Sequence, residues 1–579
     1  MTLNKLLLIK TTILTMIKIK HILTLICCLL CSNVFAASPK KADVVIYGAT
    51  SAGISAAIQA SRMGKSVILI EPSKRIGGLT TGGLGRTDIG NGSAVGGIAL
   101  EFYRRVWLHY NDESNWKWAK KQDYVNESKI DSMMWSFEPS VGLKIYKDML
   151  ANEKVQLVYS QRLNRETGVK MKGDVISQIT METGETYVGN VFIDATYEGD
   201  LMAAAGVSYT YGREANSQYG ETLNGVQANK ISLSLTGRVS RNAYNHNFID
   251  RVDPYIVKGD KSSGLLPFIN PESPGVDGSG DKKIQAFCFR MTLTDHPENR
   301  IPFEKPADYN ELDYELLFRN YEAAPNGIIE KMYNYGDSLM PWINSPMPNR
   351  KTDTNNQKGF STDFIGQNHD YVEASYAERE KIIQRHKSYQ KGLMWTLAYH
   401  PRIPKVVRDY ASRWGTCKDE YDNGDGWQDQ LYIREARRMV SDYVMTQRHC
   451  ESLDVANDPV GLGAYGMDSH HIQRYVDING YVQNEGNVEC AIPHPYPISY
   501  RSIVPKKTEC KNLIVPVCLS ATHIAFGSIR MEPVFMVLGQ SAAIAASLTI
   551  DNKTSVQDLP YEKLEKELLK YGQRLKWNK

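Results

Sequence analysis

The sequence has few cysteines for its length, nine in 579 residues, and none lies at a spacing typical of a metal or iron–sulfur site. Three of the nine lie within residues 1–36. The other six are scattered, which argues against a disulfide scaffold but leaves one or two bridges open. These six are Cys288, Cys417, Cys450, Cys490, Cys510 and Cys518. The cysteine pattern therefore predicts neither a metal site nor a small disulfide-stabilised fold.

The chain also lacks an excess of charge of either sign. Its formal net charge is +3, and residues 1–36 hold four lysines and no acidic residue, so the remainder is close to neutral. Such a balance gives no support for binding to nucleic acid or to an anionic membrane surface. The sequence also lacks the phosphate-binding loop Gly-x-x-x-x-Gly-Lys-Ser/Thr.

Long hydrophobic runs are scarce beyond the N-terminus. Basic residues precede the apolar run Ile22–Leu30, and Val34-Phe35-Ala36 follows it, which is typical of a signal peptide cleaved after Ala36. Lipid attachment at Cys31 is a less favoured alternative, because Leu30 is larger than the residue usual before such a cysteine. We expect no other run to span a bilayer. The prediction is an exported protein, either periplasmic or secreted.

The most informative segment runs from Lys41 to Thr81. Two short apolar strands, Asp43–Tyr47 and Ser66–Ile70, flank a helix of small residues, and Glu71 follows the second strand. The intervening Gly48-Ala49-Thr50-Ser51-Ala52-Gly53 resembles a dinucleotide-binding turn, in which backbone amides at a helix N-terminus face a pyrophosphate. Thr50 stands where the fingerprint has glycine. Glu71 is placed to accept hydrogen bonds from ribose hydroxyls.

Three further blocks extend this resemblance and point to FAD rather than to a nicotinamide. Pro72 is followed by Arg75-Ile76-Gly77-Gly78-Leu79-Thr80, which resembles the Arg-x-Gly-Gly segment beside the FAD pyrophosphate. Asp194-Ala195-Thr196 resembles the segment that passes the flavin on the return to the first sheet. Near the end, a segment with Gly527, Ser528 and Met531 precedes a helix that carries Gln540. The resemblance implies that these residues bind FAD.

The chain is similar to the secreted bacterial FAD-dependent oxidoreductase family, of the two-dinucleotide-binding-domain flavoprotein type, whose members are sometimes labelled xanthan lyase. The resemblance implies an α/β fold, a Rossmann-like FAD-binding domain of the glutathione reductase type with an inserted α+β substrate domain. The expected division is 1–36 signal peptide, 37–212 first part of the FAD-binding domain, 213–504 substrate domain, and 505–579 last part of the FAD-binding domain. An antiparallel meander is expected at Val155–Tyr159, Val169–Met171, Val175–Met181 and Tyr187–Ile193.

The inserted region carries weaker patterns. Asp281–Asp295 alternates like a strand of a mixed second sheet, with Asn229–Val239 as its expected partner. Tyr376–His400 and Gln430–His449 have helical spacing. In the second helix Arg434 and Arg438 would share one face, where they could clamp a carboxylate or sugar hydroxyls, although an exposed ion-paired face is the commoner outcome.

Three residues are candidates for the chemistry. His523 lies in the segment expected to line the flavin, and His470 follows Asp468, which could orient its ring. Either histidine could act as a base, with a structural hydrogen bond as the plainer alternative. Arg530 could stabilise reduced flavin, or pair with Glu532. A Ser-His-Asp hydrolase site at Ser469 is disfavoured, because no nucleophile elbow surrounds it.

These patterns predict an exported FAD-dependent oxidoreductase that transfers a hydride between FAD and an unknown small molecule. Tyrosine and tryptophan are abundant, 33 and nine against 14 phenylalanines, which makes a sugar one candidate substrate. No second dinucleotide motif is visible, so oxygen, a quinone or a protein would accept the electrons. The alternatives are a non-redox glycan lyase or hydrolase, and a glycan-binding protein that retains FAD.

Overall fold

The computed structural model describes residues 38–228, 246–248, 251–323 and 340–577. A first sheet has the strand order β3-β2-β1-β6-β5-β4, and β22 pairs with the end of β6. Its strands are β1 (Lys40–Tyr47), β2 (Val67–Ile70), β3 (Val155–Val158), β4 (Val169–Lys172), β5 (Val175–Thr180), β6 (Thr186–Asp194) and β22 (Leu513–Ile514). Five of them, β3, β2, β1, β6 and β22, are parallel, and β4 and β5 extend the sheet antiparallel.

The expected meander is confirmed for three of its four strands. β4, β5 and β6 pair antiparallel in chain order. The assignment of Val155–Tyr159 to the meander is wrong, because β3 pairs in parallel with β2, with Val155 opposite Val67. This strand follows the helix α5 (Pro139–Ala151). A helix before the strand brings the chain back to the end of the sheet where its parallel neighbour begins, as parallel pairing requires.

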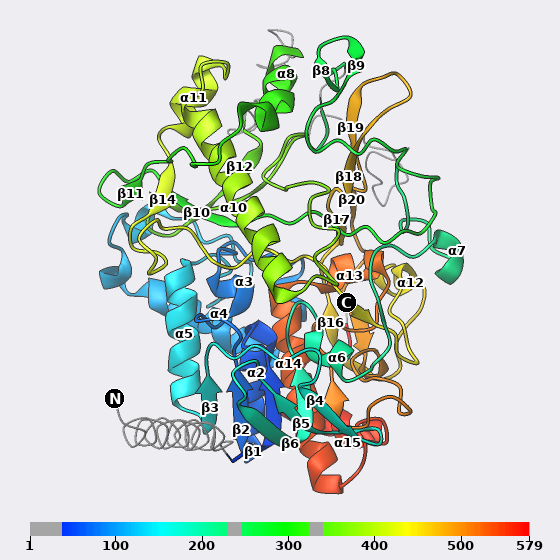
Figure 1. The fold of residues 1–579 in the computed structure, drawn as a ribbon. Coiled ribbons are helices and arrows are strands. Elements are labelled where there is room, and N and C mark those ends of the chain that lie inside the picture. The colour runs from blue at the N-terminus through cyan, green and yellow to red at the C-terminus, as the bar shows by residue number, and fades with distance from the viewer. Residues whose placement is uncertain (1–37, 229–245, 249–250, 324–339, 578–579) are drawn as a thin grey trace, which may run out of the picture.

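The C-terminal segment returns to this sheet. Leu513 and Ile514 pair with Phe192 and Ile193 of β6, although more than 300 residues separate them. In Figure 1 the blue N-terminal and red C-terminal elements lie together at the lower end, and the green and yellow segments lie above them. Two parts distant in the sequence therefore build one α/β unit around a largely parallel sheet.

Two helices pack closely beside this sheet. α2 (Ser51–Arg62) crosses α14 (Glu532–Asn552), and both are almost wholly buried. Gly539 makes the contact possible, because a Cβ atom there would lie 2.1 Å from the carbonyl oxygen of Ala52. Further helices of this part are α3 (Gly78–Thr81), α4 (Gly97–Asn111), α6 (Asp200–Ala204), α13 (His523–Ile529) and α15 (Tyr561–Lys570).

A second sheet lies in the inserted region and has five strands in the order β11-β14-β10-β13-β12. They are β10 (Met291–Thr294), β11 (Arg300–Ile301), β12 (Trp342–Met347), β13 (Lys351–Asn356) and β14 (Gly415–Cys417). Every pairing is antiparallel, so the expected mixed sheet is wrong. β10 is shorter than the predicted strand and pairs with β13 and β14; the predicted partner, Asn229–Val239, lies outside the described residues.

The two helices expected in the inserted region have different outcomes. Tyr376–His400 is confirmed as α10 (Tyr376–Tyr399), which begins with a capping box made by Ser375 and Glu378. Gln430–His449 is not one helix, since it contains the short strand β15 (Arg438–Met439) and only one turn of helix, α12 (Gln447–Cys450). The arginines of this segment pair with carboxylates on several different segments. These contacts favour an extended chain over the helix that the spacing predicts. Two shorter helices are α8 (Glu315–Ala323) and α11 (Lys405–Ala411).

Five two-stranded antiparallel sheets complete the described structure. β7 pairs with β15, β8 with β9, β16 with β21, β17 with β20 and β18 with β19. Their bounds, with the short helix α7, are β7 (Tyr209–Thr210), α7 (Asn216–Tyr219), β8 (Tyr255–Val257), β9 (Asp260–Leu265), β16 (Pro459–Gly463), β17 (Met467–Ser469), β18 (Gln473–Val476), β19 (Val482–Glu485), β20 (Val488–Cys490) and β21 (Tyr496–Ser499).

One helix among the described residues, α14, is long and apolar enough to cross a membrane, which the sequence reading did not anticipate. Because 89% of its apolar window is buried inside the protein, α14 is no clear transmembrane span and has the surroundings of a core helix. The six cysteines at positions 288–518 are all buried and unpaired. In the described part of the chain no cluster of histidine, cysteine and acidic residues could hold a metal ion.

Candidate functional site

The turn after β1 brings two of the sequence blocks together. Gly48 has a φ of 97°, and a Cβ atom there would lie 2.9 Å from the carbonyl carbon of Ala195. Thr50 caps α2, since its hydroxyl accepts from the amide of Gly53 at 3.4 Å. The same hydroxyl donates to the carbonyl oxygen of Ala195 at 2.7 Å. Thr50 therefore ties the turn to the Asp194-Ala195-Thr196 segment, a contact that a glycine could not make.

Glu71 follows β2 and closes one side of this turn. Its carboxylate accepts from the amide of Ala49 at 2.9 Å and from the amide of Ser73 at 2.8 Å. Burial raises the pKa of Glu71 above its ordinary value of 4.5, and the hydrogen bonds from Ser73 and Ala49 oppose that rise. Glu71 thus holds the turn in place and also lines the adjoining cavity.

All four blocks meet at one buried carboxylate, that of Glu532 at the start of α14. Ser51 and Thr80 donate their hydroxyl hydrogens to it at 2.5 and 2.8 Å, and Tyr197 donates its phenol hydrogen at 2.7 Å. The Tyr197 oxygen in turn accepts from the amide of Leu79 at 3.0 Å. Burial raises the pKa of Glu532, and the three hydroxyls counteract it. One side chain thus joins α2, α3, the segment after β6 and α14.

A cavity of 390 Å³ lies beside this junction. One wall consists of residues predicted to bind FAD: Gly48, Thr50, Glu71, Pro72, Arg75, Gly78 and Thr196. The other lining residues are not in the predicted FAD-binding set, and all but the first three come from the inserted region: Ser73, Tyr197, Glu198, Phe289, Tyr371, Glu380, Ile383, Gln384, Lys387, Gln428, Asp429, Gln430, Leu431 and Ile433. The cavity therefore lies between the first α/β unit and the inserted region.

Other residues predicted to bind the cofactor do not line this cavity. Leu79 donates its amide hydrogen to the lining residue Tyr197, Ser51 and Thr80 bond to Glu532 behind the lining, and Ala52, Gly53, Gly77 and Ala195 shape the turns. Asp194 is buried and accepts from the Thr196 amide, the Thr196 hydroxyl and the Met202 amide. It therefore shapes its own loop.

The predicted residues near α14 have structural contacts. Gly527 lets α13 approach β17, because a Cβ atom there would lie 2.5 Å from the carbonyl oxygen of Asp468. Ser528 donates to the carbonyl oxygen of Tyr465, and Met531 is the N-terminal cap residue of α14. Gln540 accepts from the amide of Ile98 and donates to Gln59 and Tyr571. It links three parts of the core.

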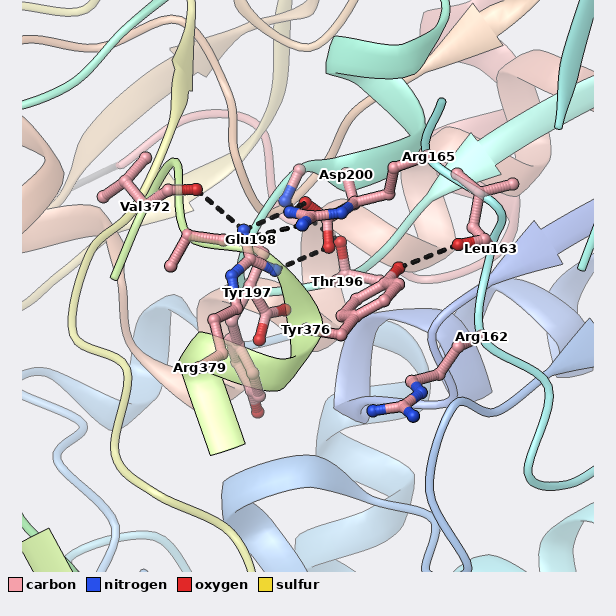
Figure 2. A network of polar contacts seen from close by, with 12 residues as sticks. Arg162, Leu163, Arg165, Thr196, Tyr197, Glu198, Asp200, Val372, Tyr376 and Arg379 are labelled. Carbon is pink, nitrogen blue, oxygen red and sulfur yellow. Dashed lines mark hydrogen bonds and ion pairs between the residues drawn. The ribbon is translucent and has the colours of Figure 1, made fainter. Parts of the chain in front are cut away.

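One cavity wall is held by a charged cluster around Asp200 (Figure 2). Arg379 of α10 donates to Asp200 at 2.7 and 3.1 Å, Arg437 donates at 2.8 Å, and Arg165 donates at 3.3 Å. Burial disfavours ionised Asp200, but Arg379 and then Arg437 and Arg165 keep its pKa below 3.8. Because α10 carries four of the cavity-lining residues, this cluster fixes α10 beside the Thr196–Glu198 segment.

His523 is committed to two protein partners. Its Nε2 lies 2.9 Å from the Ser469 hydroxyl and its Nδ1 lies 2.8 Å from the Glu435 carboxylate. This order of serine, histidine and acid is that of a hydrolytic triad, but the serine is fully buried. The geometry thus favours a structural role for His523 over the role of a base.

His470 has one nitrogen held and the other less tightly engaged. Its Nδ1 lies 2.9 Å from Asp363, and its Nε2 lies 3.6 Å from Asp468. Burial opposes ionisation of Asp363, but Arg434 and His470 outweigh it and keep its pKa below 3.8. Arg434 contacts Asp363 at 2.9 Å. The Asp363 carboxylate therefore orients the His470 ring.

Arg530 joins the same group of charges. It donates to the Tyr432 hydroxyl at 2.9 Å and to the Asp468 carbonyl oxygen at 3.0 Å, and its guanidinium lies 3.4 Å from the Asp468 carboxylate. The alternative partner Glu532 instead receives hydroxyl hydrogens. The structure thus brings Arg530, Asp468 and His470 together.

The expected shared face of Arg434 and Arg438 is wrong, because this segment is extended. Arg434 pairs with Asp363, whereas Arg438 contacts Glu214 at 2.6 Å and Glu435 at 3.1 Å. Each guanidinium is thus already neutralised by protein carboxylates. The only signal in the sequence for buried pairs is that four charged residues are interspersed among apolar and aromatic ones at 431–439.

Residues 43–568 match the sequence profile of a family described as "FAD dependent oxidoreductase". The chain belongs to the FAD dependent oxidoreductase family. It is therefore an FAD-dependent oxidoreductase enzyme and binds FAD. No curated protein matches the chain in sequence.

Solved structures match this FAD-dependent oxidoreductase only in part. L-amino acid deaminase from Proteus vulgaris is 16% identical with a TM-score of 0.22, over 31% of this chain and 53% of that chain. 3-ketosteroid-delta4-(5alpha)-dehydrogenase from Rhodococcus jostii RHA1 is 15% identical with a TM-score of 0.19, over 30% and 50%. Thioredoxin reductase from T. acidophilum is 19% identical with a TM-score of 0.17, over 31% and 40%. These partial matches carry no argument about the substrate.

The residues around the cavity fit FAD. Gly48 and Gly78 allow the turns of the cavity wall to pack tightly against the Ala195–Tyr197 segment, since a Cβ atom at either position would meet atoms of that segment at 2.9 Å or less. Arg75 donates its Nε hydrogen to the carbonyl oxygen of Thr81, whereas its Nη2 is buried without a partner in the described part of the protein. The Arg75 guanidinium also lies 5.0 Å from the Tyr421 ring centre. A diphosphate oxygen would satisfy this unpaired donor.

Several functional residues were missed by the sequence reading. Glu532 was considered only as an alternative partner of Arg530, and Tyr197, which follows the predicted Asp194-Ala195-Thr196 segment, was not among the candidates. Tyr197 fills the space above Gly78, where a Cβ atom would lie 2.3 Å from its hydroxyl oxygen. The sequence contains both the bulky Tyr197 and Gly78, but the pattern of a single chain does not show that two residues so far apart are in contact.

Proposed function

We propose that the protein is an exported oxidoreductase that transfers a hydride between FAD and a small molecule with a hydroxyl or amine on the reacting carbon. The observation that carries this proposal is the 390 Å³ cavity, which has FAD-fingerprint residues on one wall and inserted-region residues on the others. Bound FAD supplies the electron-transfer chemistry. The remaining tasks, to orient the substrate and to move one proton, fall to this chain's own residues.

His470 is the preferred proton-handling group. Its Nδ1 faces Asp363 at 2.9 Å, and its Nε2, 3.6 Å from Asp468, is the less tightly engaged nitrogen and would exchange the proton with a substrate. The side chain of His470 is 11% exposed, whereas that of His523 is 2% exposed and has both nitrogens bonded. Arg530 is proposed to stabilise negative charge on the reduced cofactor, since it brings a guanidinium to the segment just before α14.

Export and a carbohydrate-derived substrate belong to the same proposal. Export depends on the signal-peptide pattern of residues 1–36, which lie outside the described residues. A sugar is favoured over other alcohols only by the wealth of tyrosine and tryptophan. Oxygen, a quinone or a protein would accept the electrons, because the sequence shows no second dinucleotide fingerprint.

The test is the absorption spectrum of the purified protein, recorded without oxygen before and after addition of sugars, alcohols and amines. We expect one compound class to bleach the bound flavin. His470→Ala should retain FAD and slow bleaching by about 10²-fold to 10⁴-fold, the range typical of a lost general base. His494→Ala is the control, because the hydrogen bonds of His494 in the described structure go to Ser452 and to the Pro495 carbonyl oxygen, and neither residue lines the cavity.

Three results would count against the proposal in different ways. Bleaching of His470→Ala at the wild-type rate would remove the assigned base. Flavin that dithionite reduces but no candidate compound does would favour a binding protein that retains FAD. Release of unsaturated sugar by FAD-free protein would favour the lyase alternative.

A further inference from the structure

A second concave site lies away from the FAD cavity and shares no lining residue with it. It is a groove of 1010 Å³ between the segment after α4, the β12–β13 hairpin and the end of α11. We call it the aromatic groove because five aromatic side chains line it. They are Trp116, Trp118, Tyr124, Tyr410 and Trp414.

All five aromatic side chains are half-buried. The Trp118 ring is partly covered, because the His296 ring lies 4.6 Å from it. The rings of Trp116 and Tyr124 lie 5.8 Å apart with planes inclined by 46°, and those of Tyr410 and Trp414 lie 6.2 Å apart at 54°. Neither pair is stacked, so the rings do not cover one another. Ring faces of this kind can pack against the C–H face of a sugar while polar neighbours bond its hydroxyls.

Hydrogen bonds hold the two tryptophans of the first segment in place. The Trp118 indole donates to Asp419 at 2.8 Å, and its backbone amide donates to Asn349 at 3.0 Å. The Trp116 indole donates to the carbonyl oxygen of Tyr110 at 2.9 Å. Because these rings are fixed before a ligand arrives, binding would cost little side-chain entropy.

The charges on the groove are unevenly balanced. Lys117, Lys120 and Arg413 are exposed and form no ion pair within the described ranges. Lys117 lies 4.3 Å from the Trp118 ring centre, and Arg413 lies 4.8 Å from that of Tyr410. Two positive charges thus lie directly beside aromatic rings.

The other charges of the groove do not cancel this excess. Asp295 is paired with Arg350 at 2.9 Å. Lys351 is enclosed by three carboxylates, those of Glu138, Asp419 and Glu420, at 2.7 to 2.8 Å, so it adds no positive charge to the groove. Asp123 is the remaining acidic group of the lining. Among the exposed charges of the lining, three cations without an ion pair in the described structure thus stand against one acidic group, Asp123.

We propose that the aromatic groove binds an acidic oligosaccharide, one whose sugars carry carboxylates. Sugar rings provide flat C–H faces for the tryptophans, and carboxylates provide the charge that Lys117, Lys120 and Arg413 attract. The groove would hold a glycan on the protein surface without taking part in its chemistry. The proposal does not depend on the redox reaction, because the groove and the FAD cavity are separate.

The test is a titration of the FAD-loaded protein with tetragalacturonate, followed by tryptophan fluorescence and calorimetry, with cellotetraose as the neutral comparison. We expect tetragalacturonate to bind with a dissociation constant on the order of 0.1 mM and to bind more weakly as salt rises. Cellotetraose should bind at least about ten-fold more weakly, because it lacks the charge contribution.

Two sets of variants separate stacking from charge. Lys117→Gln with Lys120→Gln should weaken tetragalacturonate binding by about five-fold to ten-fold and flatten its salt dependence. Trp116→Ala should weaken both ligands by about ten-fold. Lys405→Gln and Tyr399→Ala, exposed positions outside the groove lining, are the matched controls and should change nothing.

The lysine variants keep the test decisive even if Trp116→Ala fails to fold, since both lysines are exposed and unpaired in the described structure. Equal affinity for the neutral and acidic tetrasaccharides would overturn the assignment of an acidic ligand. Absence of binding at millimolar concentration, or unchanged binding in all groove variants, would overturn the site itself. The flavin spectrum, read in the same titration, reports separately on the redox proposal.

Discussion

At the scale of single residues, Glu532 joins the four FAD-binding blocks through its hydrogen bonds. Replacing Glu532 by Ala would leave the hydroxyls of Ser51, Thr80 and Tyr197 buried without their acceptor. We expect a loss of about 2–4 kcal/mol in the free energy of unfolding and a loss of bound FAD. Glu532→Gln keeps an acceptor of the same shape, and the raised pKa of Glu532 indicates that a neutral group is tolerated there. It should retain most of its FAD.

Urea unfolding together with the flavin content of the purified variants measures this difference. Equal FAD content and stability in Glu532→Ala and Glu532→Gln would show that the hydrogen bonds at this carboxylate are dispensable.

Asp194 gives a prediction of pH dependence. Burial raises its pKa from 3.8 to about 6, although hydrogen bonds from Thr196 and Met202 oppose the rise. Between these two pKa values the folded protein binds more protons at Asp194 than the unfolded chain does. The contribution of Asp194 to the free energy of unfolding is therefore full below pH 3.8 and is lost as the pH rises through about 6. A pKa difference of this size corresponds to about 3 kcal/mol.

Asp194→Asn should therefore flatten the change in unfolding free energy between pH 4 and 6, relative to the wild type. The variant would also be less stable at every pH, because an amide cannot accept both sets of hydrogen bonds. The slope against pH, obtained from urea unfolding at several pH values, is thus the diagnostic quantity. An unchanged slope would mean that Asp194 does not titrate in this range.

At the scale of elements, α10 is held against the FAD cavity by Asp200. Asp200→Ala would leave Arg165, Arg379 and Arg437 without their shared carboxylate, and three buried or half-buried positive charges would repel one another. We expect a loss of about 3–5 kcal/mol in stability and faster release of FAD, since α10 supplies Glu380, Ile383, Gln384 and Lys387 to the cavity.

Flavin fluorescence, which rises as FAD leaves the protein, measures the release rate. Asp409→Ala is the matched control, because Asp409 pairs with Lys405 at the exposed surface of α11, and it should leave release unchanged. Release at the wild-type rate in a folded Asp200→Ala protein would contradict the role of this cluster.

Elements also show what the sequence could predict. The turn at Gly48–Gly53, the strands on either side of it, α10 and α14 follow from local periodicity and from caps. The failures at β3 and at Gln430–His449 share one cause. A strand's partner, and the pairing of Arg434, Arg437 and Arg438 with three separate carboxylates, depend on residues far away in the sequence. Glu532 was missed for the same reason.

At the scale of the whole molecule, the six cysteines between positions 288 and 518 provide a test of the proposed signal peptide and export. All six are buried and unpaired, and burial raises the pKa of Cys288 and Cys450 to about 12 and that of Cys510 to about 11. Thiols of such high pKa form little of the reactive thiolate at neutral pH. They should therefore resist oxidation outside the cell as long as the protein stays folded.

We therefore expect the folded, processed protein to react slowly with Ellman's reagent, and the chain unfolded in guanidinium without reductant to show six thiols. Cleavage after Ala36 would remove the three cysteines of residues 1–36, so a count of nine would contradict the predicted signal peptide. A count of four or two would reveal disulfide bonds and contradict the free thiols. Mass spectrometry of the intact chain distinguishes these outcomes, because cleavage changes the mass far more than disulfide formation does.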